Sequence, residues 1–209
     1  PKGVLTTVSF SNYWDFKNKI KVGIVITIRN LDGTLVSRRE VNFDDRSVLN
    51  IEVYEVEEGS IEIEAFSSIN LRIPYAAIMV VYETVNGVSM VHSYSRNHSL
   101  IEIEDDKAIT IARESCWTLR AYKNVCNKAI FHNGHIPLQS QKATLLVTKK
   151  DGSEKKIIFD VPTLKSFETY VFHAEEIFPD LHQFLESEIG WGALHFESLS
   201  SFTRLLLMW

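Results

Sequence analysis

Residues 61–66 read IEIEAF, a run that alternates apolar and acidic side chains. Successive side chains of a β-strand point to opposite faces of its sheet, so such a run places one face in a core and the other in water. Residues 100–105 (LIEIED) repeat the pattern, and residues 22–30 (VGIVITIRN) are rich in β-branched side chains and alternate in their second half. We therefore predict half-buried antiparallel strands and an all-β fold class.

Three dipeptides between such runs predict β-hairpins: Asp32–Gly33, Asn86–Gly87 and Asp151–Gly152. A two-residue hairpin of type I′ needs positive φ at both central residues, which Asn, Asp and Gly tolerate. Only residues 173–188 (HAEEIFPDLHQFLESE) space their apolar side chains as a helix does. We predict a short helix or two helical turns there, inserted between strands.

A weak internal repeat indicates how the strands are grouped. In the first half FSN, a β-branched strand and Asp32–Gly33 follow one another, and FHN, a strand and Asp151–Gly152 follow in the second. Residues 61–72 (IEIEAFSSINLR) likewise resemble residues 193–204 (ALHFESLSSFTR), with a pair of serines in each. The halves therefore read as two copies of one β-sandwich.

The chain has 209 residues, enough for one large domain or two small ones. We predict two tandem antiparallel β-sandwich domains, residues 1–108 and 109–209, with the helical insertion in the second. The boundary is expected near residues 107–113. No linker rich in proline, glycine or serine marks it, so we expect the halves to pack against each other.

The composition is that of an ordinary globular protein, with a formal net charge of −5. That balance gives no electrostatic footprint for nucleic acid or an anionic membrane, so neither is predicted as a partner. No apolar run approaches the roughly 18 residues of a membrane span, and no signal-peptide pattern opens the chain. We expect a cytoplasmic protein in which Cys116 and Cys126 are buried free thiols, while a disulfide between them stays open.

The second half resembles a known pattern. Its motifs, in order, are ESCWTLR, AIFHNG, a strand ending in Asp151–Gly152, FDVP, YVF and FESLSSFTR. This order is similar to that of sensory rhodopsin transducer proteins and related small β-sandwiches, over residues 114–209 and more faintly over residues 10–82. The resemblance implies an all-β, oligomeric domain that binds a small ligand or sugar and signals through protein contacts without known catalysis. The length and the duplication depart from a single-domain transducer, so its ligands and partners do not carry over.

The most polar cluster is VHSYSRNHS, residues 91–99. If residues 90–98 form a strand, four of its side chains share one face. Arginine clamps planar acceptors such as carboxylates, and tyrosine stacks or donates, so this face could bind an anion or a sugar. The competing interpretation is a solvent-exposed sheet edge without a ligand. The predicted ligand-binding residues are His92, Tyr94, Arg96 and His98, with Arg72 and Arg120 as possible additions.

Motifs for catalysis, metals and nucleotides are absent from the sequence. There is no G-x-S-x-G, G-x-G-x-x-G, P-loop or H-E-x-x-H, so we predict no catalytic residue, no metal and no cofactor. His92 and His98 lie too far apart along one strand to share an ion. The pair His132 and His135 (HNGH) is expected in a loop, with Asn133–Gly134 as a turn.

Aromatic side chains could form a stacking platform for a sugar, but large aromatics on strands more often lie in the core, where we expect Trp117. Residues 74–82 (PYAAIMVVY) are apolar on both faces and predict a central or interface strand. The aromatic residues considered for the platform are Trp14, Trp117, Trp191, Trp209, Tyr75, Tyr82 and Tyr122.

Three functions are compatible with these features. The favoured one is a non-catalytic binding protein that recognises a small anionic or carbohydrate ligand or a protein partner and self-associates. The second is a hydrolase or lyase in which His92 or His98 is the general base, or part of a metal site, and Arg96 holds an anion. The third is a structural accessory domain of a larger assembly. A deep pocket would favour the enzyme, a shallow groove the binding protein, and a buried face the structural domain.

Overall fold

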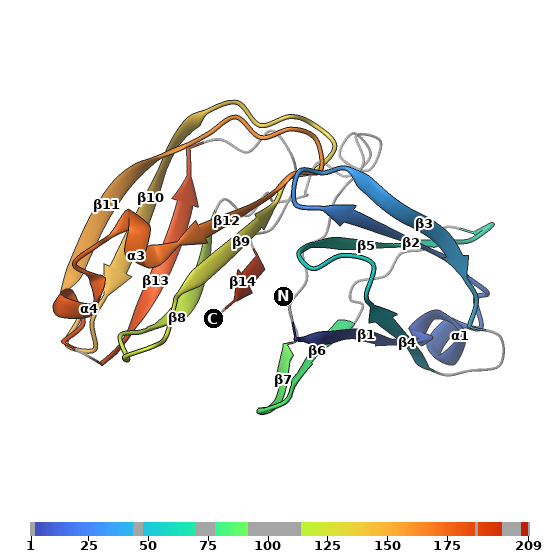
Figure 1. The fold of residues 1–209 in the computed structure, drawn as a ribbon. Helices are drawn as coiled ribbons and strands as arrows, with labels where there is room; N and C mark the ends of the chain where they lie inside the picture. The colour runs from blue at the N-terminus through green and yellow to red at the C-terminus, as the bar shows by residue number, and fades with distance from the viewer. Residues whose placement is uncertain are drawn as a thin grey trace. The chain divides into compact units, whose positions relative to one another are not determined.

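The computed structural model of the chain describes residues 3–43, 48–69, 78–91, 114–186, 188–197 and 206–208. Within them nearly all regular structure is antiparallel β-sheet with a few short helices, so the predicted all-β fold class is confirmed. The chain divides into two compact units, Pro1–Tyr94 and Ser95–Trp209 (Figure 1). The boundary predicted near residues 107–113 lies outside the described residues, and its position stays a prediction.

The first unit contains two antiparallel sheets. One has the strand order β4-β1-β6-β7 and the other the order β3-β2-β5. Helix α1 (Tyr13–Asn18) connects β1 to β2. The strands are β1 (Leu5–Ser11), β2 (Gly23–Asn30), β3 (Leu35–Val41), β4 (Val48–Val53), β5 (Gly59–Phe66), β6 (Ile78–Thr84) and β7 (Gly87–Val91).

The second unit also contains two antiparallel sheets, with the orders β11-β10-β13-β8 and β12-β9-β14. Two short helices, α3 (Ala174–Ile177) and α4 (Leu181–Phe184), lie between β12 and β13 along the chain. The strands are β8 (Glu114–Arg120), β9 (Lys128–His132), β10 (Gln141–Thr148), β11 (Glu154–Val161), β12 (Thr169–His173), β13 (Ile189–Phe196) and β14 (Leu206–Met208).

The two units share one strand order. The sheet β3-β2-β5 of the first unit corresponds strand by strand to β11-β10-β13 of the second. The strands β4-β1-β6 correspond in the same way to β12-β9-β14. The units differ in where one further strand joins. Strand β7 extends the sheet of β4, β1 and β6, whereas β8 extends the sheet of β11, β10 and β13. Positions in corresponding sheets can therefore be compared pair by pair.

Each unit buries an apolar core between its two sheets. In the first unit, Val8 and Phe10 of β1 share a core with Ile26 and Ile28 of β2. In IEIEAF the isoleucines pack against this core, as the alternation predicts. The core of the second unit draws on both of its sheets and on α4, through Leu119, Phe131, Leu145, Phe172, Leu181 and Leu194.

All three predicted hairpins form, but none has a type I′ turn. At β2–β3 the Gly33 amide donates to the Asn30 carbonyl (3.0 Å) and the Asn30 amide to the Thr34 carbonyl (3.0 Å). Only Gly33 has positive φ, at 84°, and Gly152 repeats this at β10–β11 with 85°. Both are the three-residue hairpin in which a type I turn precedes a left-handed glycine. The aspartate before each glycine accepts from the residue two positions on, which favours this turn.

The helices agree with the sequence in one unit and not in the other. The segment predicted to be helical contains α3 and α4, two short turns between strands. Helix α1 was not predicted, because six residues are too few to show a helical period. It is set by its ends: the Asn12 side chain accepts from the Asp15 amide (3.3 Å), and Lys19 closes the helix with φ of 57°.

Among the described residues, no helix is long and apolar enough to cross a membrane.

Candidate functional site

Most of the predicted ligand-binding residues lie outside the described part of the chain. This holds for His92, Tyr94, Arg96, His98 and Arg72, so the polar strand face that they would form stays a prediction.

Arg120 is the predicted site residue that the structure describes. It ends β8, where alternation places Cys116, Thr118 and Arg120 on the outward face of the sheet. Trp117 and Leu119 point the other way and are buried in the core, as predicted for Trp117. Arg120 is directly opposite Ile189 of β13. Arg120 therefore lies on the outward face of the sheet β11-β10-β13-β8.

The centre of that face is an exposed tryptophan. Trp191 of β13, 47% exposed, stands between Thr148 of β10 and Thr118 of β8 in the antiparallel register. Arg120 is two residues beyond Thr118 on the same side of β8, a diagonal neighbour of Trp191. We call this surface the Trp191 face. Its members are Cys116, Thr118, Arg120, Leu146, Thr148, Trp191 and Ala193.

Trp191 lies between two glycines whose positions face the core. Gly190 and Gly192 flank it, and both positions face the core. A Cβ added at Gly192 would lie 3.1 Å from Leu119 and 3.2 Å from Trp117, and one at Gly190 would lie 2.5 Å from Leu185. The core side of this strand is already filled, so the large side chain between the glycines belongs to the solvent side.

The end of β8 is capped by a side chain. The Asn127 carboxamide accepts from the Arg120 amide (2.8 Å) and donates to the Arg120 carbonyl (3.1 Å). Glu175 of α3 accepts from the Asn127 side chain (2.7 Å) and from its backbone amide (3.0 Å). Asn127 is fully buried. This bonding, which we call the Asn127 lock, fixes the end of β8 that carries Arg120.

A group of titratable side chains lies beside this lock. Cys126 Sγ is 3.6 Å from His173 Nδ1 and 3.9 Å from Glu175 Oε2, and His182 Nε2 is 3.6 Å from Glu175 Oε1. Burial raises the pKa of the Cys126 thiol, and the charge of Glu175 raises it further. A nucleophilic cysteine needs the opposite shift, because the thiolate is the reactive form.

Glu175 has its ionised form stabilised by the lock. Burial alone would raise the pKa of Glu175, but the side-chain and backbone hydrogen bonds of Asn127 outweigh it, and the net shift is downward. The carboxylate oxygens are thereby committed to amide donors. Within the described residues, no three or more histidine, cysteine, aspartate and glutamate side chains are arranged to hold a metal.

Two expectations about single residues are corrected. Both cysteines are free thiols as predicted, but both are exposed rather than buried. Cys116 shares the outward side of β8 because Trp117 occupies the inward side. His132 is the last residue of β9 rather than a loop residue. It is buried, with its Nδ1 2.9 Å from Thr169 Oγ1.

The aromatic platform considered from the sequence does not assemble as a group. Trp14 and Trp117 are core residues, Tyr82 is partly buried on β6, and Tyr122 is exposed beyond β8. Tyr75 and Trp209 lie outside the described residues. Of the described members of this group, Trp191 alone stands exposed at the centre of a sheet face. The sequence signal for an outward tryptophan was Gly-Trp-Gly on a strand. The two glycines share one side of the strand and have no side chains, so the tryptophan is the large side chain of the opposite side.

Comparison of the chain with models of protein families and with curated proteins finds no match. The resemblance to sensory rhodopsin transducer proteins therefore stays a prediction.

Proposed function

We propose that the protein is a non-catalytic β-sandwich binding protein and that its second unit binds a carbohydrate on the Trp191 face. One observation carries the proposal. A tryptophan that is 47% exposed lies on an inner strand of a sheet whose other side is a complete core. Packing of the unit does not require this side chain, so a role in recognition accounts for its position.

The chemistry around Trp191 suits a sugar ring. The face of an indole carries negative charge, and one side of a pyranose presents weakly positive C–H groups. Thr118 and Thr148 stand on either side of Trp191, where their hydroxyls can bond the hydroxyls at the rim of a ring. The Thr148 hydroxyl lies 3.5 Å from Glu154 Oε1, and this carboxylate is a further hydrogen-bond acceptor. Arg120 adds a cation near the same ring if the sugar carries a carboxylate.

The catalytic alternative has less support. It places the general base at His92 or His98, which lie outside the described residues. The described group of Cys126, His173 and Glu175 has a thiol with a raised pKa and a carboxylate already bonded to Asn127. A protein partner on the Trp191 face remains the competing occupant, and the experiment below separates it from a sugar.

The test is a titration of the full chain with a panel of neutral and acidic mono- and oligosaccharides, followed by tryptophan fluorescence and calorimetry. We expect at least one sugar to bind, with affinity reduced at least tenfold in Trp191→Ala and severalfold in Thr118→Val. Tyr54→Ala is the matched control, because Tyr54 is 77% exposed in the first unit and its loss should leave binding unchanged.

Two results would overturn the proposal. One is a panel in which no sugar binds the wild type. The other is a sugar that binds Trp191→Ala as tightly as the wild type. A mass above one chain in light scattering that falls in Trp191→Ala would assign the face to a protein contact.

A further inference from the structure

A second surface, in the first unit, is apolar and unlike the Trp191 face. It is the outward face of β4-β1-β6-β7. Val88 and Met90 of β7 are 68% and 63% exposed there, directly opposite Glu83 and Val81 of β6. Leu5 of β1, opposite Glu83 on its other side, is also exposed. Together these residues form an apolar cluster at the β7 end of the sheet.

The edge of this sheet is open among the described residues. Strand β7 pairs with β6 on one side and with no described strand on the other. Its sequence, GVSMV, has no charge and no proline, the usual means of protecting an edge. The edge strands β3 and β11 carry charged runs, Arg38–Glu40 and Glu154–Lys156. The last residue of β8, Arg120, has its backbone amide and carbonyl bonded by the Asn127 lock. Strand β7 therefore offers backbone groups and apolar side chains together.

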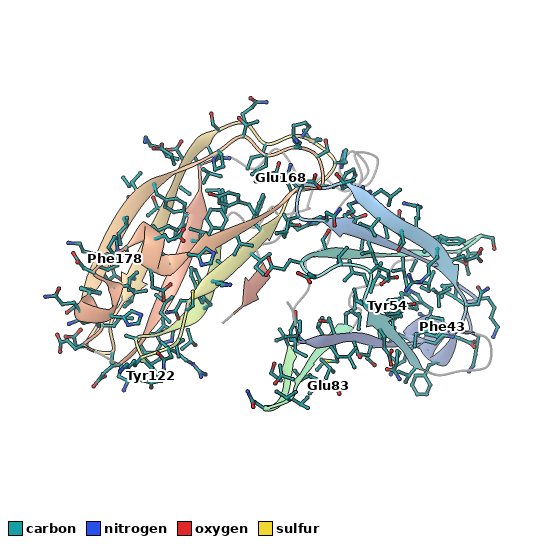
Figure 2. All side chains as sticks on the ribbon, viewed as in Figure 1. Phe43, Tyr54, Glu83, Tyr122, Glu168 and Phe178 are labelled. Carbon is teal, nitrogen blue, oxygen red and sulfur yellow. The ribbon has the colours of Figure 1, made fainter. Side chains whose placement is uncertain are left out.

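The charge of the surface is entirely negative. The four strands β1, β4, β6 and β7 contain no lysine, arginine or histidine. Their charged side chains are Glu52 and Glu83, both exposed and neither in an ion pair with a described residue. Glu83 stands beside the β6–β7 hairpin (Figure 2). A second copy of this face would bring further carboxylates to it, whereas a cationic partner would neutralise them.

We propose that β7 and this acidic apolar face bind an extended segment of a partner protein that presents apolar and basic side chains on the same face, two residues apart. The segment adds to β7 as a further strand, so its backbone groups bond those of β7 and its apolar side chains cover Val88 and Met90. The added strand lies about 10 Å from β6, two strand spacings away. A lysine or arginine on its outward side can span that distance to Glu83. This surface is independent of the carbohydrate proposed for the second unit.

The experiment uses the full chain and two synthetic peptides as probes. In one, valine and lysine take turns at every second position with threonine between them, so that both side chains share one face of a strand; the other has glutamate in place of lysine. Calorimetry and amide NMR spectra of the chain measure binding. We expect the lysine peptide to bind at least tenfold more tightly than the glutamate peptide and to protect β7 amides from exchange. Raising the salt concentration should weaken the complex.

Three variants locate the site. Met90→Lys should reduce affinity for the lysine peptide at least tenfold, and Glu83→Gln should reduce it severalfold with a smaller salt dependence. Val85→Lys is the matched control, since Val85 is 98% exposed at the hairpin tip, outside the paired rows of the face. An unchanged thermal transition in each variant verifies that it is folded. If Met90→Lys does not fold, Glu83→Gln still decides the question.

Four outcomes would overturn the proposal. Both peptides could bind equally or not at all, or Met90→Lys and Glu83→Gln could bind like the wild type. Light scattering could show a dimer that Met90→Lys dissociates, which would assign the face to a second copy. Protection of the β7 amides in the chain alone, without peptide, would mean that the protein itself covers the edge. None of these outcomes bears on sugar binding at Trp191.

Discussion

Two corresponding sheets of this protein, β3-β2-β5 and β11-β10-β13, have the same strand order and different outward faces. In the first unit, Thr27 of β2 lies between Arg38 and Glu62. At the same place in the second unit, Leu146 of β10 lies between Lys156 and Ala193. The inward positions of both sheets are apolar. The strand order therefore depends on the inward side, which leaves the outward side free to differ.

The outward face in the first unit is covered by ion pairs. Arg29 bonds Glu62 at 3.2 Å, and Arg38 bonds Glu64 at 2.8 Å and the Thr27 hydroxyl at 3.2 Å. Thr27 is completely buried beneath these charged side chains. Long charged side chains can cover a sheet in this way because their apolar stems lie on it while the charges remain near water. The exposed aromatic side chain of this face, Phe66, is at the end of the edge strand β5 and lies over Gly23, whereas Trp191 is on an inner strand between two threonines.

The edges of the two units also differ. The further strand of the second unit, β8, is capped at its last residue, Arg120, by the Asn127 lock, whereas the further strand of the first unit, β7, is open among the described residues. The first unit thus has an open edge on β4-β1-β6-β7 among the described residues, the second has an exposed tryptophan on β11-β10-β13-β8, and these two sheets do not correspond. This difference predicts two binding surfaces of different chemistry.

The largest expected effect contrasts the two sides of one sheet. Trp117→Ala should lower the free energy of unfolding of the second unit by about 4 kcal/mol, because it empties a core position. Trp191→Ala should change it by less than about 0.5 kcal/mol, because the side chain faces solvent. Urea unfolding followed by circular dichroism measures both. Similar losses in the two variants would mean that Trp191 is structural.

The next effect tests the protected edge of the second unit. Asn127→Ala removes both bonds to the Arg120 backbone and the side-chain donor to Glu175, while the backbone amide of residue 127 stays, so it should cost about 3 kcal/mol of unfolding free energy. Gln139→Ala, at an exposed loop position, is the control and should stay within about 0.5 kcal/mol. Hydrogen exchange should show faster exchange of the Arg120 amide in Asn127→Ala. An unaffected Arg120 amide would argue against the lock.

A smaller effect tests the ion pairs that cover the first unit. The side chains of Arg29 and Glu62 are only 14% and 16% exposed. Glu62→Gln leaves the guanidinium without its ionised partner in a largely buried place, so it should cost about 2 kcal/mol. Glu64→Gln is the comparison, because Arg38 and Glu64 are half exposed and their pair should be worth about 0.5 kcal/mol. Equal losses in a urea titration would show that burial does not distinguish the pairs.

The pH dependence of the second unit should report on the same lock. The folded pKa of Glu175 lies below the ordinary value of about 4.3, so the unfolded chain takes up this proton first as the pH falls. The stabilisation is complete above that ordinary value and is lost as the pH falls through the folded pKa. Between pH 6 and pH 3, at about 25 °C, Glu175→Gln should lose less stability than the wild type. Parallel curves for the two proteins would exclude Glu175 as a contributor.

Much of the architecture was predictable because it depends on local patterns. The alternation in IEIEAF indicated β5 and its buried side, and the Asp-Gly dipeptides indicated the hairpins after β2 and β10. The turn type was missed because a type I turn followed by glycine uses the same residues as a type I′ turn. The Asn127 lock could not be predicted, since Asn127 and Glu175 are 48 residues apart and no pattern links them.

The sequence by itself determined which side of each strand is apolar and where the chain reverses, because these follow from side-chain alternation and from glycine's conformational freedom. Only the tertiary structure decided which outward faces are covered and which remain exposed. Trp191 and Trp117 are equally apolar in the sequence, yet one is core and the other faces water. Their difference arises from neighbours on other strands, which pairing and register bring together and which no single stretch of sequence contains.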